Sequence, residues 1–225
     1  MDGILLFDKP AGWTSHDAVD FVRRHVGQKA VGHAGTLDPM ATGLLVLLLG
    51  KATKRSQEFS GLDKEYTGTL TLGTVTDTLD KEGRILDTRP YEGISEKDVQ
   101  AAFLELTGTF PQIPPSFSAI KVKGKKLYDL ARSGIMVEAE PRMVTVHEFK
   151  LTDFSPPLAA FRVKCSKGTY IRSLGDSVGK KLGCGAMLSS LVRTRVGALS
   201  LENALTEKIF SSMPSSQIES SLVQK

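Results

Sequence analysis

The sequence has little of what metal-binding and disulfide-bonded proteins need. Its two cysteines, Cys165 and Cys184, lie too far apart for a CxxC redox or zinc pair and are too few for a disulfide framework. We expect both thiols to be reduced and structural. The four histidines show no HxH or HExxH spacing and have no clustered cysteines or carboxylates beside them: His16, His25, His33 and His147. No metal site is therefore expected.

Long apolar segments are also missing. The longest aliphatic run, Leu44 to Leu49, is far shorter than the about 20 residues that cross a bilayer. The first residues lack the basic start and the apolar core of a secretory signal. The segment from Gly43 to Thr53 loosely matches a phosphate-binding loop, but Ala52 stands where that loop needs a magnesium-binding Ser or Thr. We expect a cytoplasmic globular protein that binds no membrane and hydrolyses no nucleoside triphosphate.

Positive charge is concentrated in two parts of the chain. The net charge is only +4, yet residues 161–200 contain eight basic side chains and one acidic side chain, Asp176. A second basic group lies earlier in the sequence and consists of Lys121, Lys123, Lys125 and Lys126. Such groups suit a polyanion such as RNA, and they also suit a solvated basic surface. The charge alone leaves both interpretations open.

The hydrophobic pattern predicts an α+β fold with a mixed, largely antiparallel sheet. Strands are expected where apolar residues alternate or run together, over residues 4–7, 44–49, 66–72, 144–146 and 161–165. Helices are expected after the capping patterns at Thr14 and Ser95 and from Thr169 to Leu182, where apolar residues recur at helical spacing. Strands mostly follow strands, which argues against a doubly wound sheet.

The chain length alone is compatible with one large domain or two small ones, and we expect one. We expect this domain over residues 1–210. Residues 211–225 contain six serines and only scattered apolar residues, which predicts a flexible, frayed tail.

One carboxylate stands out in the segment from Gly32 to Pro39, where two glycines and a proline predict an irregular loop. Asp38 lies just before this proline and before the apolar run. From local chemistry alone, Asp38 fits a turn initiator, and His33 fits a loop histidine with a local hydrogen bond. Residues 32–45 read GHAGTLDPMATGLL, and this segment resembles the active-site motif of the TruB family, tRNA pseudouridine synthases that act on uridine 55.

Further motifs that resemble the same family follow in the same order. They are KPAGWTS at residues 9–15, KEY at 64–66, LG at 72–73, DT at 77–78, PPSFSAIK at 114–121 and CSKGTYIR at 165–172. Together the resemblance covers about residues 3–200. It implies the pseudouridine synthase fold, with residues 1–210 as the catalytic domain and an RNA-binding insertion near residues 90–142.

The resemblance also implies a role for each matching residue. Asp38 would be the essential nucleophile, with Tyr170 and Arg172 in the same pocket, and the target base would stack on Tyr66. The other residues that match substrate-binding positions are His33, Leu191, Lys9 and Lys64, and the lysines expected to contact the RNA backbone are Lys121, Lys123, Lys125 and Lys126. Without the resemblance, Tyr66 and Leu191 also fit core positions, and Arg172 fits a surface cation.

The implied reaction needs no cofactor, because the base is only detached, turned and rejoined through another atom. The nucleotide must first be flipped into a pocket, at a cost of a few kcal/mol. Because burial opposes the ionisation of a carboxylate, we expect Arg172 to pair with Asp38 and hold it charged. Tyr170 is expected to take the proton from C5. Attack of Asp38 on C6 of uracil and attack on C1′ of ribose both stay open.

Two departures from the family pattern stand out. The sequence stops before the C-terminal PUA-type domain of many relatives, so an isolated T-arm hairpin is expected to be nearly as good a substrate as full tRNA. Phe117 stands where relatives commonly have tyrosine. We expect the tRNA T arm as partner, no obligate protein partner and a monomer. The alternatives are a non-catalytic RNA-binding or tRNA-folding protein, and an enzyme of the same fold that acts on another RNA.

Overall fold

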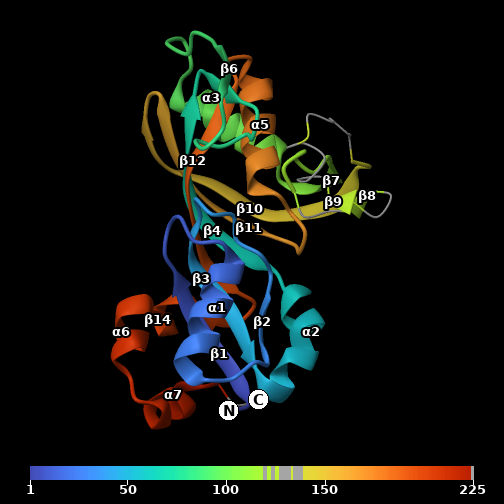
Figure 1. Cartoon of the computed structure of the whole chain (residues 1–225). Helices are drawn as coiled ribbons and strands as arrows, with labels where there is room; N and C mark the ends of the chain where they lie inside the picture. Colours follow the sequence, from blue (N-terminus) through green and yellow to red (C-terminus); the bar gives the residue numbers. More distant parts are fainter. Residues whose placement is uncertain (119–120, 123–124, 127–132, 134–138, 224–225) are drawn as a thin grey trace. The chain divides into compact units, whose positions relative to one another are not determined.

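Figure 1 shows the computed structural model of the chain, which describes residues 1–118, 121–122, 125–126, 133 and 139–223. The chain divides into two compact units: unit 1 comprises Met1–Thr67 and Leu191–Lys225, and unit 2 comprises Gly68–Ser190. The strands β4 (Lys64–Leu72) and β12 (Ala186–Val196) each contribute residues to both units. The expectation of a single catalytic domain over residues 1–210 stays a prediction.

Unit 1 is built of strands with helices packed beside them. Its further elements are β1 (Gly3–Lys9), α1 (Ser15–Val26), β2 (Val31–Ala34), β3 (Thr42–Leu49), the 3-10 helix η1 (Gly50–Arg55), α2 (Ser56–Ser60), β13 (Leu199–Ser200), the 3-10 helix η2 (Leu201–Asn203), β14 (Leu205–Thr206), α6 (Glu207–Ser212) and α7 (Ser215–Ser221). The strand order is β14, β1, β3, β12, and β2 pairs with β3. The β1–β3 and β2–β3 pairs are antiparallel, whereas β14 pairs with β1 and β12 pairs with β3 in parallel.

The apolar strand β3 lies at the centre of unit 1. Every residue from Leu44 to Leu49 is completely buried, as expected of a strand that is covered on both faces. The helix α1 begins with the capping box predicted at Thr14: the Thr14 hydroxyl accepts a hydrogen bond from the N–H of Asp17, and the Asp17 carboxylate accepts one from the N–H of Thr14. The predicted strand and helix are both confirmed.

The C-terminal residues of unit 1 are packed, so the expectation of a frayed tail is wrong for residues 211–223. The side chains of Phe210 and Ile218 are completely buried, and Val223 forms a backbone bridge with Ile4 of β1. The ring centroid of Phe210 lies 5.8 Å from that of Phe21 on α1. Composition misled the prediction because a few well-spaced apolar side chains suffice to dock two short helices.

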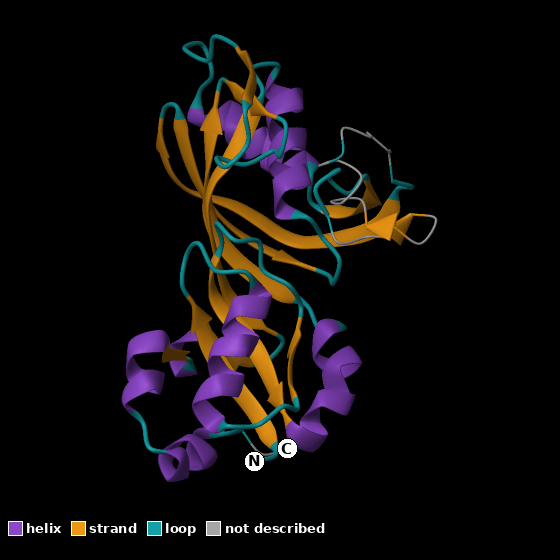
Figure 2. Cartoon of the chain, viewed as in Figure 1, coloured by secondary structure: helices purple, strands orange, loops and turns teal. Residues whose placement is uncertain are grey.

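Unit 2 is built of strands with two longer helices packed against them. Besides its parts of β4 and β12, it contains β5 (Thr74–Thr76), β6 (Ile85–Thr88), α3 (Glu96–Glu105), β7 (Gly108–Gln112), β8 (Lys121–Val122), β9 (Lys125–Lys126), β10 (Arg142–Ser155), β11 (Leu158–Cys165) and α5 (Ile171–Leu182). The strand order is β12, β4, β11, β10, β7, while β5–β6 and β8–β9 form separate antiparallel pairs. The helix α3 packs against β10 and α5 (Figure 2).

An aromatic cluster holds α3 on this sheet. The ring of Phe103 on α3 stacks on that of Phe149 on β10, with centroids 3.8 Å apart. The ring of Phe161 on β11 meets Phe149 edge-on at 5.5 Å. The predicted strands and the predicted α3 helix are confirmed, whereas α5 begins at Ile171, two residues later than the expected start at Thr169.

The loop expected from Gly32 to Pro39 is shorter than predicted. Residues as far as Ala34 belong to β2, and His33 lies opposite Leu47 of β3. The neighbouring strand satisfies the backbone hydrogen bonds of this glycine-containing segment, which overrides its local preference for a turn. The irregular part is therefore residues 35–41.

The α+β class with mixed, largely antiparallel strand pairing is confirmed. In the part of the chain that the structure describes, no helix combines the length and the apolar character needed to span a bilayer.

We expect Phe210→Ala to lower the free energy of unfolding by about 3–5 kcal/mol, because removing a fully buried ring leaves a cavity beside α1. The matched control is Ile209→Ala, one residue earlier, where the side chain is 48% exposed and the loss should be about 1 kcal/mol or less. Urea unfolding followed by tryptophan fluorescence measures both. Equal, small losses would show that the C-terminal segment is not packed.

Candidate active site

The loop that carries Asp38 connects β2 to β3. The side chains of Leu37, Met40 and Ala41 in this loop are buried, whereas Asp38 itself is only half-buried. The N–H of Ala41 donates a hydrogen bond to the Asp38 carbonyl at 3.1 Å. Buried neighbours therefore fix the backbone on both sides of Asp38, while its side chain keeps access to solvent.

The start of α1 and the turn before it hold the residues that flank Asp38. The hydroxyl of Ser15 accepts a hydrogen bond from the N–H of Leu37 at 2.9 Å and donates one to the Leu37 carbonyl at 3.2 Å. On the other side of Asp38, the carbonyl of Pro39 accepts a hydrogen bond from the N–H of Gly12 at 2.9 Å. The loop is thus fixed immediately before and immediately after the carboxylate.

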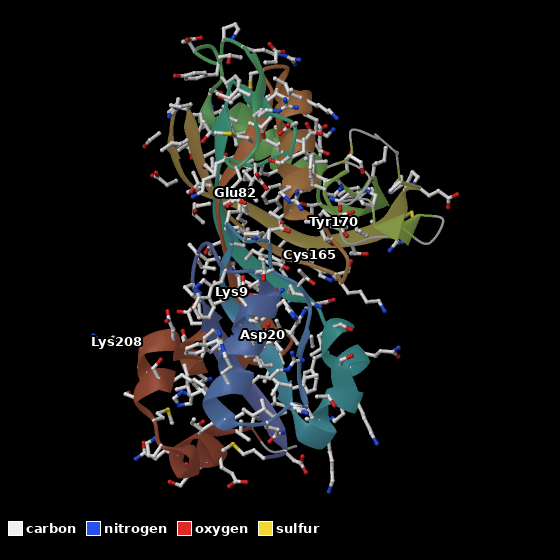
Figure 3. The ribbon with its side chains drawn as sticks, viewed as in Figure 1. Lys9, Asp20, Glu82, Cys165, Tyr170 and Lys208 are labelled. Carbon is white, nitrogen blue, oxygen red and sulfur yellow. The ribbon has the colours of Figure 1, made fainter. Side chains whose placement is uncertain are left out.

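Lys9, at the end of β1, is completely buried (Figure 3). Its ammonium donates to the carbonyls of Pro10 at 2.9 Å, Trp13 at 2.6 Å and Pro39 at 3.3 Å. A buried ammonium is costly unless such acceptors surround it. Lys9 therefore ties the end of β1 to the following turn and to the Asp38 loop. Its expected contact with the substrate stays a prediction.

Arg193 on β12 is 1% exposed, and its guanidinium contacts the loop. Its guanidinium donates to the carbonyls of Leu44 at 2.7 Å, Gly35 at 3.0 Å and Thr36 at 3.2 Å. The planar guanidinium carries five N–H donors, so one side chain can serve several carbonyls at once. Arg193 therefore joins β12, β3 and the loop.

Two glycines of the motif have backbone conformations or contacts that other residues would not tolerate. Gly43 has φ +96° and lies opposite Arg193 in the parallel pair of β3 and β12; a Cβ there would lie 2.5 Å from the Arg193 carbonyl oxygen. Gly35 has φ +89°, in the left-handed region that favours glycine. Gly43 therefore allows the close approach of β12 to β3, whereas Gly35 allows the left-handed backbone of the loop.

The other predicted site residues of unit 1 are largely buried. Tyr66 on β4 is 8% exposed and Leu191 on β12 is 6% exposed. The ammonium of Lys64 donates to the carbonyls of Ser60 at 2.7 Å and Leu62 at 2.6 Å. Burial suits both a core residue and a base-stacking residue, so the substrate-binding roles of these three residues stay predictions.

His33 is half-buried on β2, and its Nδ1 atom is buried without a hydrogen-bond partner. Burial, followed by the positive charges of Arg193 and His16, lowers the pKa of His33 below its usual value of 6.5. The imidazole is therefore neutral at neutral pH. A neutral ring can occupy space between apolar groups, which is compatible with the substrate-binding position that His33 is expected to hold.

In unit 2, the buried Arg172 is bonded at several points. Its guanidinium donates to the carbonyls of Thr78 at 3.0 Å and Phe117 at 2.9 Å, and its Nε lies 3.6 Å from a carboxylate oxygen of Asp80. Asp80 also accepts hydrogen bonds from the Thr78 hydroxyl at 2.6 Å and from the N–H of Glu82 at 3.0 Å. Phe117 accepts the hydrogen bond from Arg172 through its backbone carbonyl. Phenylalanine in place of the tyrosine common in the family therefore leaves this contact unchanged.

The structure distributes the predicted residues over the two units. Unit 1 holds Asp38, His33, Lys9, Lys64, Tyr66 and Leu191, and unit 2 holds Tyr170 and Arg172. The expected pairing of Arg172 with Asp38 stays a prediction. Among the basic group, Lys121 lies opposite Lys126 and Lys125 opposite Val122 in the β8–β9 pair, and Lys123 lies outside the described residues.

Sequence reasoning missed three residues of this arrangement: Ser15, Arg193 and Asp80. Arg193 shares the buried phase of its strand with Leu191, two positions earlier, and a charged residue in that phase indicates a buried anchor. Asp80 follows the Asp77-Thr78 motif by two residues but lies outside the quoted pattern. Ser15 ends the KPAGWTS motif, but nothing in that motif indicates its contacts with Leu37.

A hollow of about 570 Å³ lies in unit 2 between α5 and the Pro-rich segment after β7. Its lining includes Leu79, Pro114, Asp176 and Lys180, and none of the predicted site residues contributes to it. We therefore assign it no part in the site.

Metal-binding groups do not gather in the described residues: no three His, Cys, Asp or Glu side chains there could hold a metal ion together. Neither Cys165 nor Cys184 forms a disulfide, and both are buried. The absence of a cofactor stays a prediction.

A model of a known protein family matches most of the chain. Residues 23–171 fit the family model described as "TruB family pseudouridylate synthase (N terminal domain)". The chain belongs to the TruB family. The match includes the Asp38 loop, Tyr66 and Asp80, whereas the buried anchors Lys9, Ser15 and Arg193 lie outside the matched residues.

Two relatives show how far the TruB similarity extends. A protein named tRNA pseudouridine synthase B from Opitutus terrae is 48% identical over 223 residues, which cover 99% of this chain and 92% of the relative. A protein of the same name from Thermobifida fusca is 50% identical over 213 residues, covering 91% of this chain and 73% of the relative.

Solved structures agree with this family. The crystal structure of a Cbf5-Nop10-Gar1 complex contains a chain that is 30% identical and aligns with a TM-score of 0.71, covering 92% of this chain and 52% of that chain. The structure of an H/ACA RNP bound to a substrate RNA containing 2'-deoxyuridine contains one that is 27% identical, with a TM-score of 0.67 and coverage of 91% and 50%. The expected pseudouridine synthase fold is confirmed, and the TruB protein described here is a pseudouridine synthase, an isomerase.

We expect Arg193→Met to lower the free energy of unfolding by about 3 kcal/mol, because the buried Leu44 carbonyl and the part-buried carbonyls of Gly35 and Thr36 lose their donor, at about 1–3 kcal/mol for a buried group. The control Arg195→Met, on the same strand, removes only a single contact of 3.4 Å with the Ala198 carbonyl and should cost about 1 kcal/mol or less. Chemical denaturation compares the two. A similar loss for both would remove Arg193 as the anchor of the loop.

Proposed function

We propose that the protein isomerises uridine 55 in the T loop of tRNA to pseudouridine, with Asp38 as the nucleophile. The observation that carries the proposal is the fixed backbone around Asp38, which the buried side chains of Ser15, Lys9 and Arg193 hold from both sides. A half-buried carboxylate held in this way suits a nucleophile that must meet one atom of a bound nucleotide. The relatives named tRNA pseudouridine synthase B support tRNA as the RNA.

The reaction exchanges a C–N bond for a C–C bond within one nucleotide. The bond between N1 of uracil and C1′ of ribose breaks, the base turns, and C5 bonds to C1′. The proton on C5 is lost and N1 gains one, so atoms and electrons balance without a co-reactant. Asp38 forms a bond to the nucleotide and later releases it, which divides a difficult step into easier ones.

The unit 1 residues would receive the flipped nucleotide. Tyr66 offers an aromatic face on which the base can stack, a contact worth about 1–3 kcal/mol per base. Leu191 would pack against the nucleotide. The neutral imidazole of His33 would fill the space that the base vacates.

The unit 2 residues would supply charge and a proton acceptor. The two carbonyls and the Asp80 carboxylate hold the Arg172 guanidinium in one orientation. Pairing with this cation would keep the Asp38 carboxylate ionised within a closed site. Tyr170 would take the proton from C5. Lys9 and Lys64 would contribute positive charge near the bound RNA.

The RNA chain itself would contact the basic group Lys121, Lys123, Lys125 and Lys126, and the T arm would be the part of tRNA that is bound. An isolated T-arm hairpin would then be nearly as good a substrate as full tRNA. The protein would act in the cytoplasm as a monomer without an obligate protein partner.

If these lysines contact phosphates, the double variant Lys125→Gln/Lys126→Gln should reduce the slope of log affinity against log salt by about 0.7–0.9 per lost contact. A matched double variant, Lys97→Gln/Lys208→Gln, changes the same charge at exposed positions on α3 and α6 and should leave the slope unchanged. Titration of labelled T-arm RNA at several salt concentrations gives both slopes. Identical slopes in all three proteins would remove the RNA from this group.

The decisive experiment maps pseudouridine in a T-arm RNA treated with the wild-type protein and with Asp38→Asn. We expect modification at the single target uridine by the wild type, and a loss of turnover on the order of 10³-fold or more in the variant, with RNA binding retained. Asp153→Asn makes the same chemical change at an exposed position of β10 and should retain full turnover.

Each other outcome has a distinct meaning. An unmodified RNA after wild-type treatment, with binding and refolding of tRNA intact, would favour a non-catalytic RNA-binding protein. Modification by Asp38→Asn at the wild-type rate would remove Asp38 as the nucleophile.

A further inference from the structure

The helix α5 begins with an unusual residue. Its N-cap is Tyr170, whose side chain makes no capping hydrogen bond. By contrast, α1 and α3 begin with complete capping boxes at Thr14 and Ser95. N-cap positions strongly prefer Ser, Thr, Asp or Asn, and other residues there cost about 0.5–2 kcal/mol. The N–H of Tyr170 is one of the donors at the helix start that have no acceptor within the helix, so it needs a partner from outside.

Gln112 provides these partners. Its side-chain oxygen accepts a hydrogen bond from the N–H of Tyr170 at 2.8 Å, and its side-chain nitrogen donates one to the Tyr170 carbonyl at 3.1 Å. That carbonyl also accepts the first helical bond, from the N–H of Leu174 at 3.0 Å. Because an N–H only donates and a carbonyl only accepts, the orientation of the Gln112 amide is determined by these contacts.

The position of Gln112 is itself well fixed. It is the last residue of β7, lies opposite Arg142 of β10 and is 5% exposed. In a capping box the N3 side chain would accept the N–H of the N-cap residue. Here the N3 residue is Ser173, and its hydroxyl instead donates to the carbonyl of Ile113 at 3.0 Å. Gln112 thus replaces the missing acceptor from a neighbouring strand.

The two hydrogen bonds of Gln112 fix both peptide groups that flank the Cα atom of Tyr170. With the N–H on one side and the carbonyl on the other both held, φ and ψ of Tyr170 are set at −93° and 110°. The direction of the Cα–Cβ bond is then set as well.

We propose that Gln112 is a positioning residue of the pseudouridine synthase reaction, which aims the phenol of Tyr170 at the reacting base by holding the Tyr170 backbone. The inference rests on the role of Tyr170 under the proposed function. Catalysis is sensitive to the position of a reacting group, because a displacement of that group by about 1 Å can lower the rate about 100-fold. If Gln112 had only a structural role, its substitution would lower the stability of the fold and leave the turnover of the folded protein unchanged.

The test uses the full chain and a T-arm RNA labelled with tritium at C5 of the target uridine, whose release reports turnover. Under single-turnover conditions with saturating RNA, we expect Gln112→Met to lower the rate about 10-fold or more, with RNA affinity changed less than about 2-fold. The control Ser173→Ala removes the neighbouring contact between the same two segments and should keep the wild-type rate.

A double-mutant cycle separates positioning of Tyr170 from a general structural effect. Tyr170→Phe alone should slow turnover, and adding Gln112→Met to it should lower the rate less than about 2-fold further, because the phenol that Gln112 aims is already gone. Effects that multiply in the double variant, or an equal loss of rate in Ser173→Ala, would overturn the inference.

Gln112→Glu provides a second variant if Gln112→Met does not fold. The carboxylate keeps an acceptor for the Tyr170 N–H but turns a second oxygen towards the Tyr170 carbonyl, and protonation restores the donor there. Turnover of this variant relative to the wild type should therefore rise as pH falls. A pH profile parallel to that of the wild type would count against the inference.

Failure of the proposed function has a different signature. In that case the wild-type protein would form no pseudouridine, or Tyr170→Phe would turn over at the wild-type rate. If both of these controls behave as expected and Gln112→Met keeps the wild-type rate, only the role of Gln112 is refuted.

Discussion

The buried guanidinium of Arg193 is the contact on which the arrangement around Asp38 depends. Within the loop of residues 35–41, the Asp38 carbonyl is paired by the N–H of Ala41, whereas the carbonyls of Gly35 and Thr36 take their donor from β12. Carbonyls that are shielded from water and lack donors are costly. One side chain of β12 satisfies Gly35, Thr36 and Leu44 together. Since carbonyls carry only partial negative charge, much of the positive charge of Arg193 persists next to the loop, where an anionic substrate must approach. Structure and electrostatics thus depend on the same residue.

Much of the fold was predictable because its patterns are local. The apolar run from Leu44 to Leu49, the alternation from Tyr66 to Leu72 and the capping patterns at Thr14 and Ser95 each specify one element from nearby residues. The family and its fold were predictable from ordered motifs. The predicted site residues lie within or beside the motifs that resemble the family, so the resemblance identifies their positions. Their roles stay predictions.

The remaining features depend on contacts between residues distant in sequence. Arg193 bonds to carbonyls about 150 residues earlier, and Gln112 serves a helix that begins nearly 60 residues later, so no local pattern reveals either. The serine-rich composition of the C-terminal residues predicts a tail, whereas the structure buries the side chains of Phe210 and Ile218. The strand at His33 exists because β3 pairs with it, although its glycines favour a turn. In each case a tertiary contact overrides the local preference.

The discontinuity of unit 1 has a consequence for the newly made chain. Unit 2 is a continuous stretch from Gly68 to Ser190, whereas unit 1 combines Met1–Thr67 with Leu191–Lys225. On the ribosome, β1 and β3 emerge long before β12, so their apolar surfaces must wait for partners that are translated more than a hundred residues later. The Asp38 loop therefore receives its Arg193 anchor only after the whole of unit 2 has been translated.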